Sequence, residues 1–235
     1  MEKFWCIYVP RGTVIYFLFA NILAMFLYPG GNHLELDQVG YSLNKNFLSE
    51  LGFHYTMSGD VNFFSSFFFN SAMYVCLLQG IAYLFIPKLF KRNNIAYLFA
   101  WIGSILIFIS NVFFVGVGLT PADLFFDEHI FFVLTAFNVS TIAIFFLMLS
   151  FIFAPISNYY TFGAFILFMF IGLYAFYISD VPQINPIEDR ELFVETISME
   201  FLKMNVVIQK FIVLSMLTSI FIFSFGHEKL LNEGQ

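Results

Sequence analysis

Six long apolar stretches constrain this chain more than any other feature of its sequence. An α-helix needs about 20 mostly apolar residues to cross a bilayer, where only an internally hydrogen-bonded helix satisfies its own backbone. Hydrophobic residues make up 60% of the 235 residues and charged residues only 11%, against roughly 25% charged in an ordinary soluble domain. The sequence therefore predicts an all-α, polytopic membrane helix bundle with six transmembrane helices, over residues 13–28, 61–87, 95–119, 130–155, 161–179 and 204–225.

One transmembrane domain is predicted over residues 1–235, because the chain shows no internal repeat or linker. The first apolar stretch ends in Tyr28-Pro29-Gly30-Gly31 without a small-x-small cleavage site, so we expect a retained helix rather than a cleaved signal peptide. Cys6 and Cys76 lie in the N-terminal tail and deep inside the second stretch, and are expected to form neither a disulfide nor a cysteine metal site. The abundance of Phe, Ile and Asn suggests a bacterial source.

Charges separate the connections between the helices into two sets. The acids gather in the connections 30–60, 120–129 and 180–203. Lys and Arg are enriched in the cytoplasmic loops of membrane proteins, and with six spans every basic connection falls on one side. We therefore predict a multi-pass protein of the cell (cytoplasmic) membrane with both termini cytoplasmic, oriented by Lys3, Arg11, Lys88, Lys91, Arg92 and Lys229.

The outer connections 30–60 and 180–203 are long, whereas the inner ones are short. Long loops on a rigid scaffold often carry function. Their apolar spacing predicts short amphipathic helices on the outer face, over residues 44–51 and 187–204, the second leading into the sixth span. Thr120-Pro121-Ala122-Asp123 has the residues of a helix start, with Thr as the cap and Pro at the first helical position.

Side chains able to bind a ligand concentrate at this outer face. If the helices close into a bundle, the outer connections converge over its mouth and form a site for a lipid head group or a cation. Lys210, about 10 Å below the entrance of the sixth helix, either extends outward or pairs with an outer acid such as Asp180. The predicted ligand-binding residues are Ser49, Glu50, His54, Asn70, Asp123, His129, Asp180 and Lys210.

Acid–base chemistry, if the protein is an enzyme, would use His129, Asp123 or Asp127. His54, Asp127 and His129 also offer donors that suit zinc, but no His-x-x-x-His or Glu-x-x-His pair places two ligands on one helix face. We therefore predict neither a metal nor a cofactor. The alternative explanation is structural: Asp127 favours the dipole of a helix start, and His129 forms a local hydrogen bond.

Other polar residues have a functional and a structural explanation. Ser49 is a candidate nucleophile without the Gly-x-Ser-x-Gly elbow, or it belongs to a helix-terminating turn with a left-handed Gly52. Asn62, Ser66 and Asn70 share one stripe of the second span, which suits either helix packing or a ligand pocket. A nucleic-acid partner is excluded, since the orientation of the chain already explains the single basic cluster at 88–92.

Four sequence motifs resemble a prokaryotic six-helix integral membrane family of unknown function. That family is itself reminiscent of the eukaryotic family of damage-regulated autophagy modulators and a GPI-anchor lipid-remodelling factor. The resemblance covers mainly residues 13–145. It implies a six-helix bundle with an outer-face feature carried here by Ser49, Glu50, Asp123 and His129, and it supplies no established reaction. The motifs are residues 28–31, 40–42, 46–52 and 118–123, the last followed by His129.

These features favour a multi-pass membrane protein that binds a lipid or other amphiphile through an extracytoplasmic polar cluster. One alternative is a membrane-embedded lipid hydrolase or acyltransferase that uses the outer-face His and Asp residues. A second is a subunit that docks another membrane protein or a second copy of itself. The expected partner is a membrane lipid in the first two cases and a protein in the third, and the sequence leaves open whether the protein is an enzyme.

Overall fold

The computed structural model describes residues 1–233, which are mainly helical and contain no β-strand. Six of the helices in this range are long and apolar enough to cross a membrane, which confirms the predicted all-α bundle and supports a multi-pass membrane protein. The long helices are α1 (Val9–Leu27), α2 (Phe63–Tyr83), α3 (Asn94–Leu119), α4 (Phe126–Ile152), α5 (Asn158–Asp180) and α7 (Met199–Glu233). The short ones are η1 (Phe4–Tyr8), η2 (Leu48–Gly52), η3 (Ile86–Phe90) and α6 (Arg190–Thr196).

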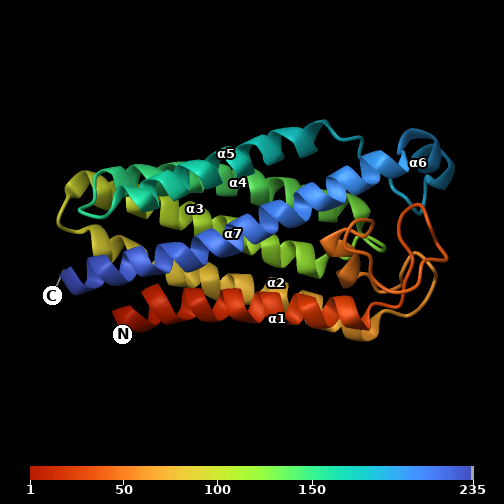
Figure 1. The fold of residues 1–235 in the computed structure, drawn as a ribbon, viewed down its shortest axis with the longest axis horizontal. Helices are drawn as coiled ribbons and strands as arrows, with labels where there is room; N and C mark the ends of the chain where they lie inside the picture. Colours follow the sequence, from red (N-terminus) through yellow and green to blue (C-terminus); the bar gives the residue numbers. More distant parts are fainter. Residues whose placement is uncertain (234–235) are drawn as a thin grey trace.

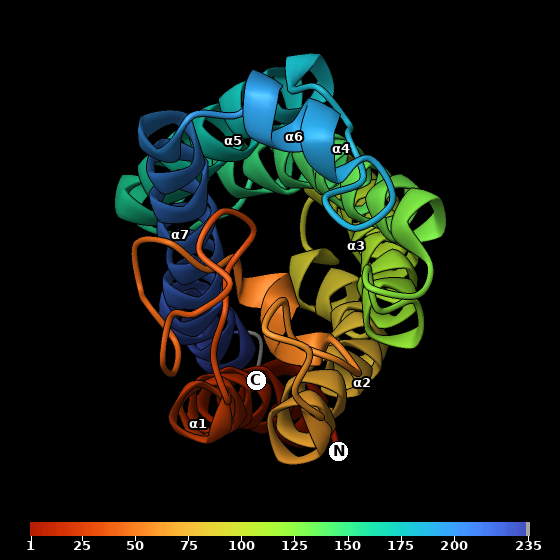
Figure 2. The same ribbon diagram turned by 90° about the vertical axis from the view of Figure 1, so that its right-hand side faces the viewer.

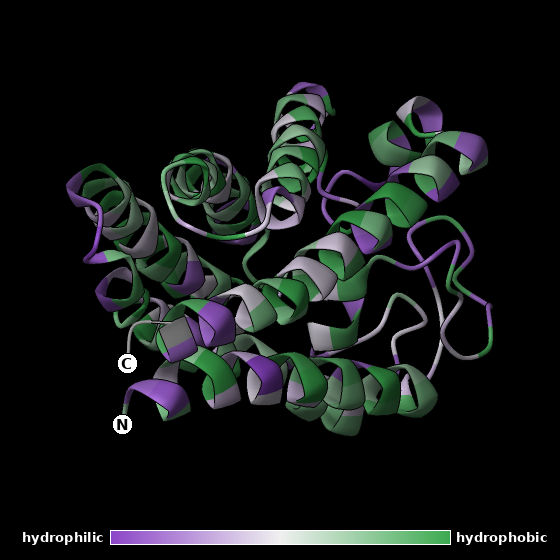
Figure 3. Cartoon of the chain, turned by 60° about the vertical axis from the view of Figure 1, so that its left-hand side comes forward, coloured by the Kyte–Doolittle hydropathy of each residue, from purple (hydrophilic) through white to green (hydrophobic). Residues whose placement is uncertain are grey.

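The long helices form a ring around a common interior. From α1 to α5, each packs against the next one in the chain, and α7 contacts both α5 and α1 and so closes the ring (Figure 2). Both termini lie at one end of the bundle, whereas α6 and the segment 30–62 lie at the other (Figure 1). Hydrophobic residues run along the helices, and hydrophilic ones gather at the ends and in the loops (Figure 3).

Small residues allow α3 and α4 to approach closely, as expected for membrane helices. A Cβ atom added to Gly103 would lie 2.8 Å from Leu147 of α4, and one added to Gly116 would lie 2.3 Å from Phe132. Between these two positions the hydroxyl groups of Ser110 and Ser140 are 2.6 Å apart and hydrogen-bonded. These small and polar residues of α3 therefore pack directly against α4.

The edges of several helices differ from those predicted. The first apolar helix begins at Phe4 and the last at Met199, so both extend over charged residues, Arg11 and Lys203, whose long side chains can reach polar surroundings. The fourth span begins at Phe126 rather than residue 130. Hydropathy averaged along the sequence locates a helix core better than its ends.

The expected helix start at Thr120–Asp123 is wrong. Thr120 instead ends α3, and its hydroxyl donates to the carbonyl oxygen of Gly116 at 2.9 Å. Residues 121–124 form a turn, and α4 begins at Phe126. The carboxylate of Asp123 accepts hydrogen bonds from the backbone N–H groups of His54 and Tyr55 rather than capping its own helix.

The amphipathic helices predicted in the outer connections are shorter than expected. The first is reduced to the 3₁₀-helix η2, and the second is split by Ile197 and Ser198 into α6 and the start of α7. Phe193 and Ile197 turn inward and pack with Leu202 and Val206 of α7. This small hydrophobic cluster fixes α6 across the outer end of the bundle.

Candidate functional site

The segment 30–62, here termed the outer cap, is held by hydrogen bonds from polar residues at the start of α2. The Asn62 amide donates to the carbonyl oxygens of Leu51 and Phe53, at 3.0 and 2.9 Å, and Ser66 donates to that of Gly52 at 3.0 Å. This stripe of α2 therefore packs against the outer cap instead of facing a ligand. Asn70 continues the stripe and donates to Ser66 at 3.1 Å.

Two glycines let the outer cap fold this tightly. Gly31 has φ +78°, and a Cβ there would lie 2.5 Å from the backbone nitrogen of Ser58. Gly52 does not adopt the left-handed conformation expected for it. It is required instead because a Cβ would lie 2.6 Å from the ring of Phe69 on α2.

Glu50 is fully buried at the centre of the outer cap. Its two carboxyl oxygens accept hydrogen bonds from the Phe47 backbone N–H at 2.6 Å and the Asn46 amide at 2.7 Å. The same Asn46 amide also donates to the carbonyl oxygen of Gly31 at 2.7 Å. Burial raises the pKa of Glu50 to about 8, because the hydrogen bonds and the nearby Lys210 only partly offset the loss of water.

His33 lies beside Glu50 and was not among the predicted site residues. Its Nε2 is 3.5 Å from Oε1 of Glu50, and its ring contacts the rings of Phe47, Phe53 and Phe193. Burial, together with the positive charge of Arg190, lowers the pKa of His33 to about 3. At neutral pH this pair is therefore a neutral imidazole beside a mainly protonated carboxyl group, not an ion pair.

The outer cap is also fixed to α7. Gln209 accepts a hydrogen bond from the Leu48 backbone N–H at 2.7 Å. The next residue, Lys210, donates to the carbonyl oxygen of Asn46, and its ammonium lies 5.2 Å from the ring centre of Tyr41. Of the two alternatives for Lys210, outward extension or pairing with an outer acid such as Asp180, the structure shows an ammonium directed to the outer cap, near Glu50 and not paired with Asp180.

A cavity of about 170 Å³ lies between the outer cap, α4, α5, α6 and α7, and is termed the outer cavity. Its walls are mainly aromatic and aliphatic, and no Asp, Glu, Lys or Arg lines it. Apolar walls with a few polar groups are typical of sites for small molecules. The polar residues that line it are His33, Ser49, His129, Gln183, Asn205 and Gln209.

His129 presents a defined tautomer to this cavity. Its Nδ1 lies 2.7 Å from the carbonyl oxygen of Thr120, which can only accept a hydrogen bond. The proton of the neutral ring is therefore on Nδ1, and Nε2 carries a lone pair. The predicted local hydrogen bond of His129 is present, and the ring also lines the cavity.

The structure brings together only part of the predicted ligand-binding set. Ser49 and His129 line the outer cavity, and Glu50 lies directly behind its wall next to His33. Four other members lie away from the cavity. Asp123 accepts hydrogen bonds from the backbone of the outer cap, and Asn70 donates to Ser66. His54 and Asp180 are exposed, the latter at the end of α5. Asp127, one of the acid–base candidates, is also exposed.

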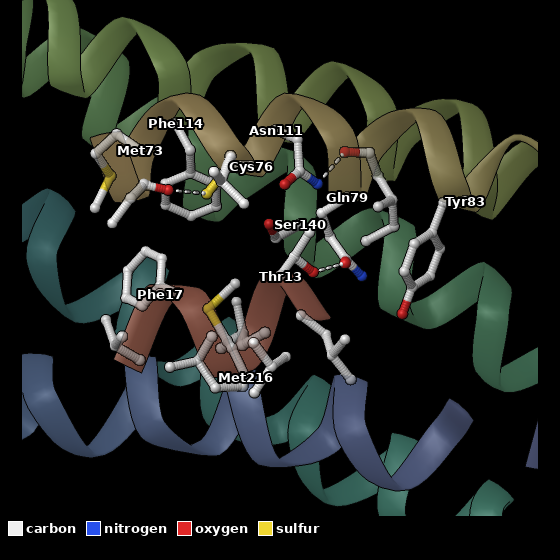
Figure 4. A pocket seen from close by; sticks show the side chains of 18 of the residues that line it. Thr13, Phe17, Met73, Cys76, Gln79, Tyr83, Asn111, Phe114, Ser140 and Met216 are labelled. Carbon is white, nitrogen blue, oxygen red and sulfur yellow. Dashed lines mark hydrogen bonds between the residues drawn. The ribbon is translucent and has the colours of Figure 1, made fainter. Parts of the chain in front are cut away.

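A second cavity, of about 120 Å³, lies deeper in the ring, is lined by all six long helices and is termed the central cavity (Figure 4). One end of the Gln79 amide is 2.5 Å from the hydroxyl of Thr13, and the other end is buried without a hydrogen-bond partner. Nearby, the Asn111 amide donates to its own helix at Ile107. Within residues 1–233, no group of three or more His, Cys, Asp or Glu side chains is placed to hold a metal ion.

This geometry defines a six-helix membrane bundle whose outer cap encloses an uncharged cavity. Comparison with family models, with curated proteins and with solved structures finds no match to this chain. The family resemblance drawn from the sequence motifs therefore stays a prediction.

Proposed function

We propose that the protein binds a membrane lipid or other amphiphile in the outer cavity. The observation that carries this proposal is a cavity with apolar walls and a few neutral polar side chains, among them His33, whose buried Nδ1 has no hydrogen-bond partner. A buried polar atom without a partner costs free energy, and a ligand hydroxyl or carbonyl would remove that cost. The apolar walls would in turn bind a hydrocarbon chain.

Lipids retained through purification test this proposal. The His129→Ala variant is expected to retain at least about fivefold less lipid, because one hydrogen bond to the ligand is lost. The matched control is His54→Ala, since His54 is exposed and does not line the cavity. The measurement is mass spectrometry of lipids extracted from equal amounts of purified protein.

A cavity-filling pair of variants on α5 tests the same proposal by size. Ile178→Trp places a larger ring in the outer cavity, whereas Phe176→Trp changes a residue that is 72% exposed on the other side of the same helix. Only the first is expected to lose the retained lipid. Equal lipid content in both variants and in the wild type would contradict binding in this cavity.

A lipid hydrolase is a second candidate, favoured by the His33–Glu50 contact next to Ser49 in the cavity wall. Such an enzyme needs the serine within reach of the imidazole, and no hydrogen bond joins them in the part of the chain described. A fluorophosphonate probe separates the two functions, because an activated serine is labelled in the wild type and not in Ser49→Ala. Absence of labelling in both proteins would contradict a serine hydrolase.

We also propose that the termini are cytoplasmic and the outer cap is extracytoplasmic. Both termini lie at the end of the bundle that carries the basic turn 88–92, which supports this orientation. In a variant with Cys6 and Cys76 replaced by Ser, a cysteine at exposed His54 is expected to react with an impermeant maleimide in intact cells. A cysteine at exposed Lys91 is expected to react only after permeabilisation, and the reverse pattern would invert the orientation.

A further inference from the structure

We infer that the ligand is an uncharged, single-chain amphiphile whose head group lies in the outer cavity and whose chain extends into the central cavity. This inference rests on the proposed function and adds the chemical class of the ligand and its path through the bundle. Three features of the structure carry it: the charge of the outer cavity, the position of two unpartnered polar groups, and the helices shared by both cavities.

The outer cavity offers no charge to a charged head group. No Asp, Glu, Lys or Arg lines it, and three charged side chains next to its lining residues already have partners within the protein. Arg190 donates to the carbonyl oxygens of His33 and Leu34, Lys210 donates to that of Asn46, and Glu50 accepts from the outer cap. Burial of a phosphate or a quaternary amine there would leave its charge uncompensated, which is far more costly than burial of a hydroxyl or carbonyl group.

In the region described, the lining of each cavity contains one side chain with a buried polar atom that has no hydrogen-bond partner. In the outer cavity this side chain is His33, through Nδ1, and in the central cavity it is Gln79, through one end of its amide. Otherwise the central cavity is lined mainly by apolar side chains, among them Phe17, Met73 and Met216 (Figure 4). An engineered cavity of about 150 Å³ binds one benzene ring, so a cavity of about 120 Å³ offers space for the end of one hydrocarbon chain and not for two chains side by side.

The two cavities follow each other along the same helices. On α5, Tyr174 lines the outer cavity and Ile171, one turn away, lines the central one. On α7, Gln209 and Val213 are related in the same way. From Leu202 to Phe223 the lining of α7 extends over 21 residue steps, or about 31 Å at 1.5 Å per residue. The two cavities therefore follow each other along α5 and α7, and a chain that displaces the side chains between them would occupy both.

A photoreactive hexadecanol with a diazirine near the end of its chain tests the path. The full-length protein is reconstituted in phosphatidylcholine nanodiscs, irradiated and mapped by mass spectrometry. Cross-links are expected at the residues of α2 and α7 that line the central cavity, among them Ala72, Met73, Cys76 and Gln79 on α2 and Val213, Met216, Leu217 and Ile220 on α7. Cross-links confined to lipid-facing residues or to the outer cavity would overturn the chain path.

Competition with unlabelled compounds of the same chain length tests the head group. Hexadecanol is expected to displace the probe at least tenfold more effectively than hexadecyl phosphate or hexadecyltrimethylammonium. Equal displacement by a charged compound overturns the uncharged head group but leaves amphiphile binding intact. Labelling that no compound displaces contradicts the proposed function itself.

A pair of neighbouring variants provides a further check. Val213→Phe fills the central cavity, whereas Leu214→Phe changes a residue that is 54% exposed on the outside of α7. Labelling is expected to fall severalfold in the first and to stay unchanged in the second. If Val213→Phe does not fold, the cross-link map in the wild type decides the chain path alone.

Discussion

Replacement of Glu50 by Ala is expected to lower the free energy of unfolding by about 3 kcal/mol, since it removes a buried acceptor and leaves a cavity. The Phe47 N–H loses its partner, and the Asn46 amide keeps only its bond to Gly31. Glu50→Gln is expected to cost less, about 1–2 kcal/mol, because its amide keeps the shape of the carboxyl group and one acceptor oxygen but cannot accept the second hydrogen bond.

Thermal unfolding of the purified protein in one detergent measures both variants. Glu35→Ala is the matched control in the same segment, because Glu35 is a partly exposed acid whose ion pair with Lys45, at 2.7 Å, contributes little to stability. Equal loss of stability in Glu50→Ala and Glu35→Ala would contradict a central role for Glu50. A loss in Glu50→Gln as large as in Glu50→Ala would show that the ionised carboxylate, rather than its shape, is required.

The number and order of the membrane helices could be predicted because hydropathy acts over about twenty residues at a time. The separation of basic from acidic connections can also be seen without any three-dimensional contact. In the structure, both termini lie at one end of the bundle. Helix ends depend on local competition instead. The hydroxyl of Thr120 donates to the backbone of α3, and Pro121 cannot continue that helix. Thr120, which was expected to cap the start of a helix, therefore ends α3.

The candidate site could be predicted only in part. Ser49 and His129 were expected in one outer cluster, and both line the outer cavity. His33 could not be selected, because its role depends on a contact with Glu50 and on an aromatic surrounding that includes Phe193, 160 residues away in the sequence. A lone histidine in an aperiodic loop carries no pattern that would reveal such neighbours. Its place in a long outer loop was the only signal.

Several of the sequence motifs now have a structural explanation. Gly31 and Gly52 leave no space for a side chain, and Asn46 and Glu50 hold the centre of the outer cap together. These residues therefore fix the shape of the cavity wall rather than contact a ligand directly. Ser49 and His129 differ from them, since both line the cavity itself.

The stability of the wild type is expected to fall as the pH rises from 6.5 to 8. The ordinary pKa of a glutamate is 4.5, and burial raises that of Glu50 to about 8. Between these pH values Glu50 holds a proton in the folded protein that it has released in the unfolded chain. The free energy of unfolding therefore falls as the pH rises. The pKa of His33 is lowered from its ordinary 6.5 to about 3, so between these pH values the unfolded chain holds the extra proton. Over that range His33 makes the protein more stable as the pH rises, the opposite of Glu50.

Above pH 6.5 the effect of Glu50 is therefore not offset by His33. Each pH unit over which the two states differ by one proton changes the free energy of unfolding by about 1.4 kcal/mol, so the loss between pH 6.5 and 8 is about 2 kcal/mol. Glu50→Gln cannot titrate, and its stability is expected to change by much less over the same range. Parallel pH profiles of the two proteins in thermal unfolding would show that Glu50 is already ionised in the folded state. The network of the outer cap would then contain a buried charge, and Lys210, whose ammonium lies near Glu50 and donates to Asn46, would be its counter-ion.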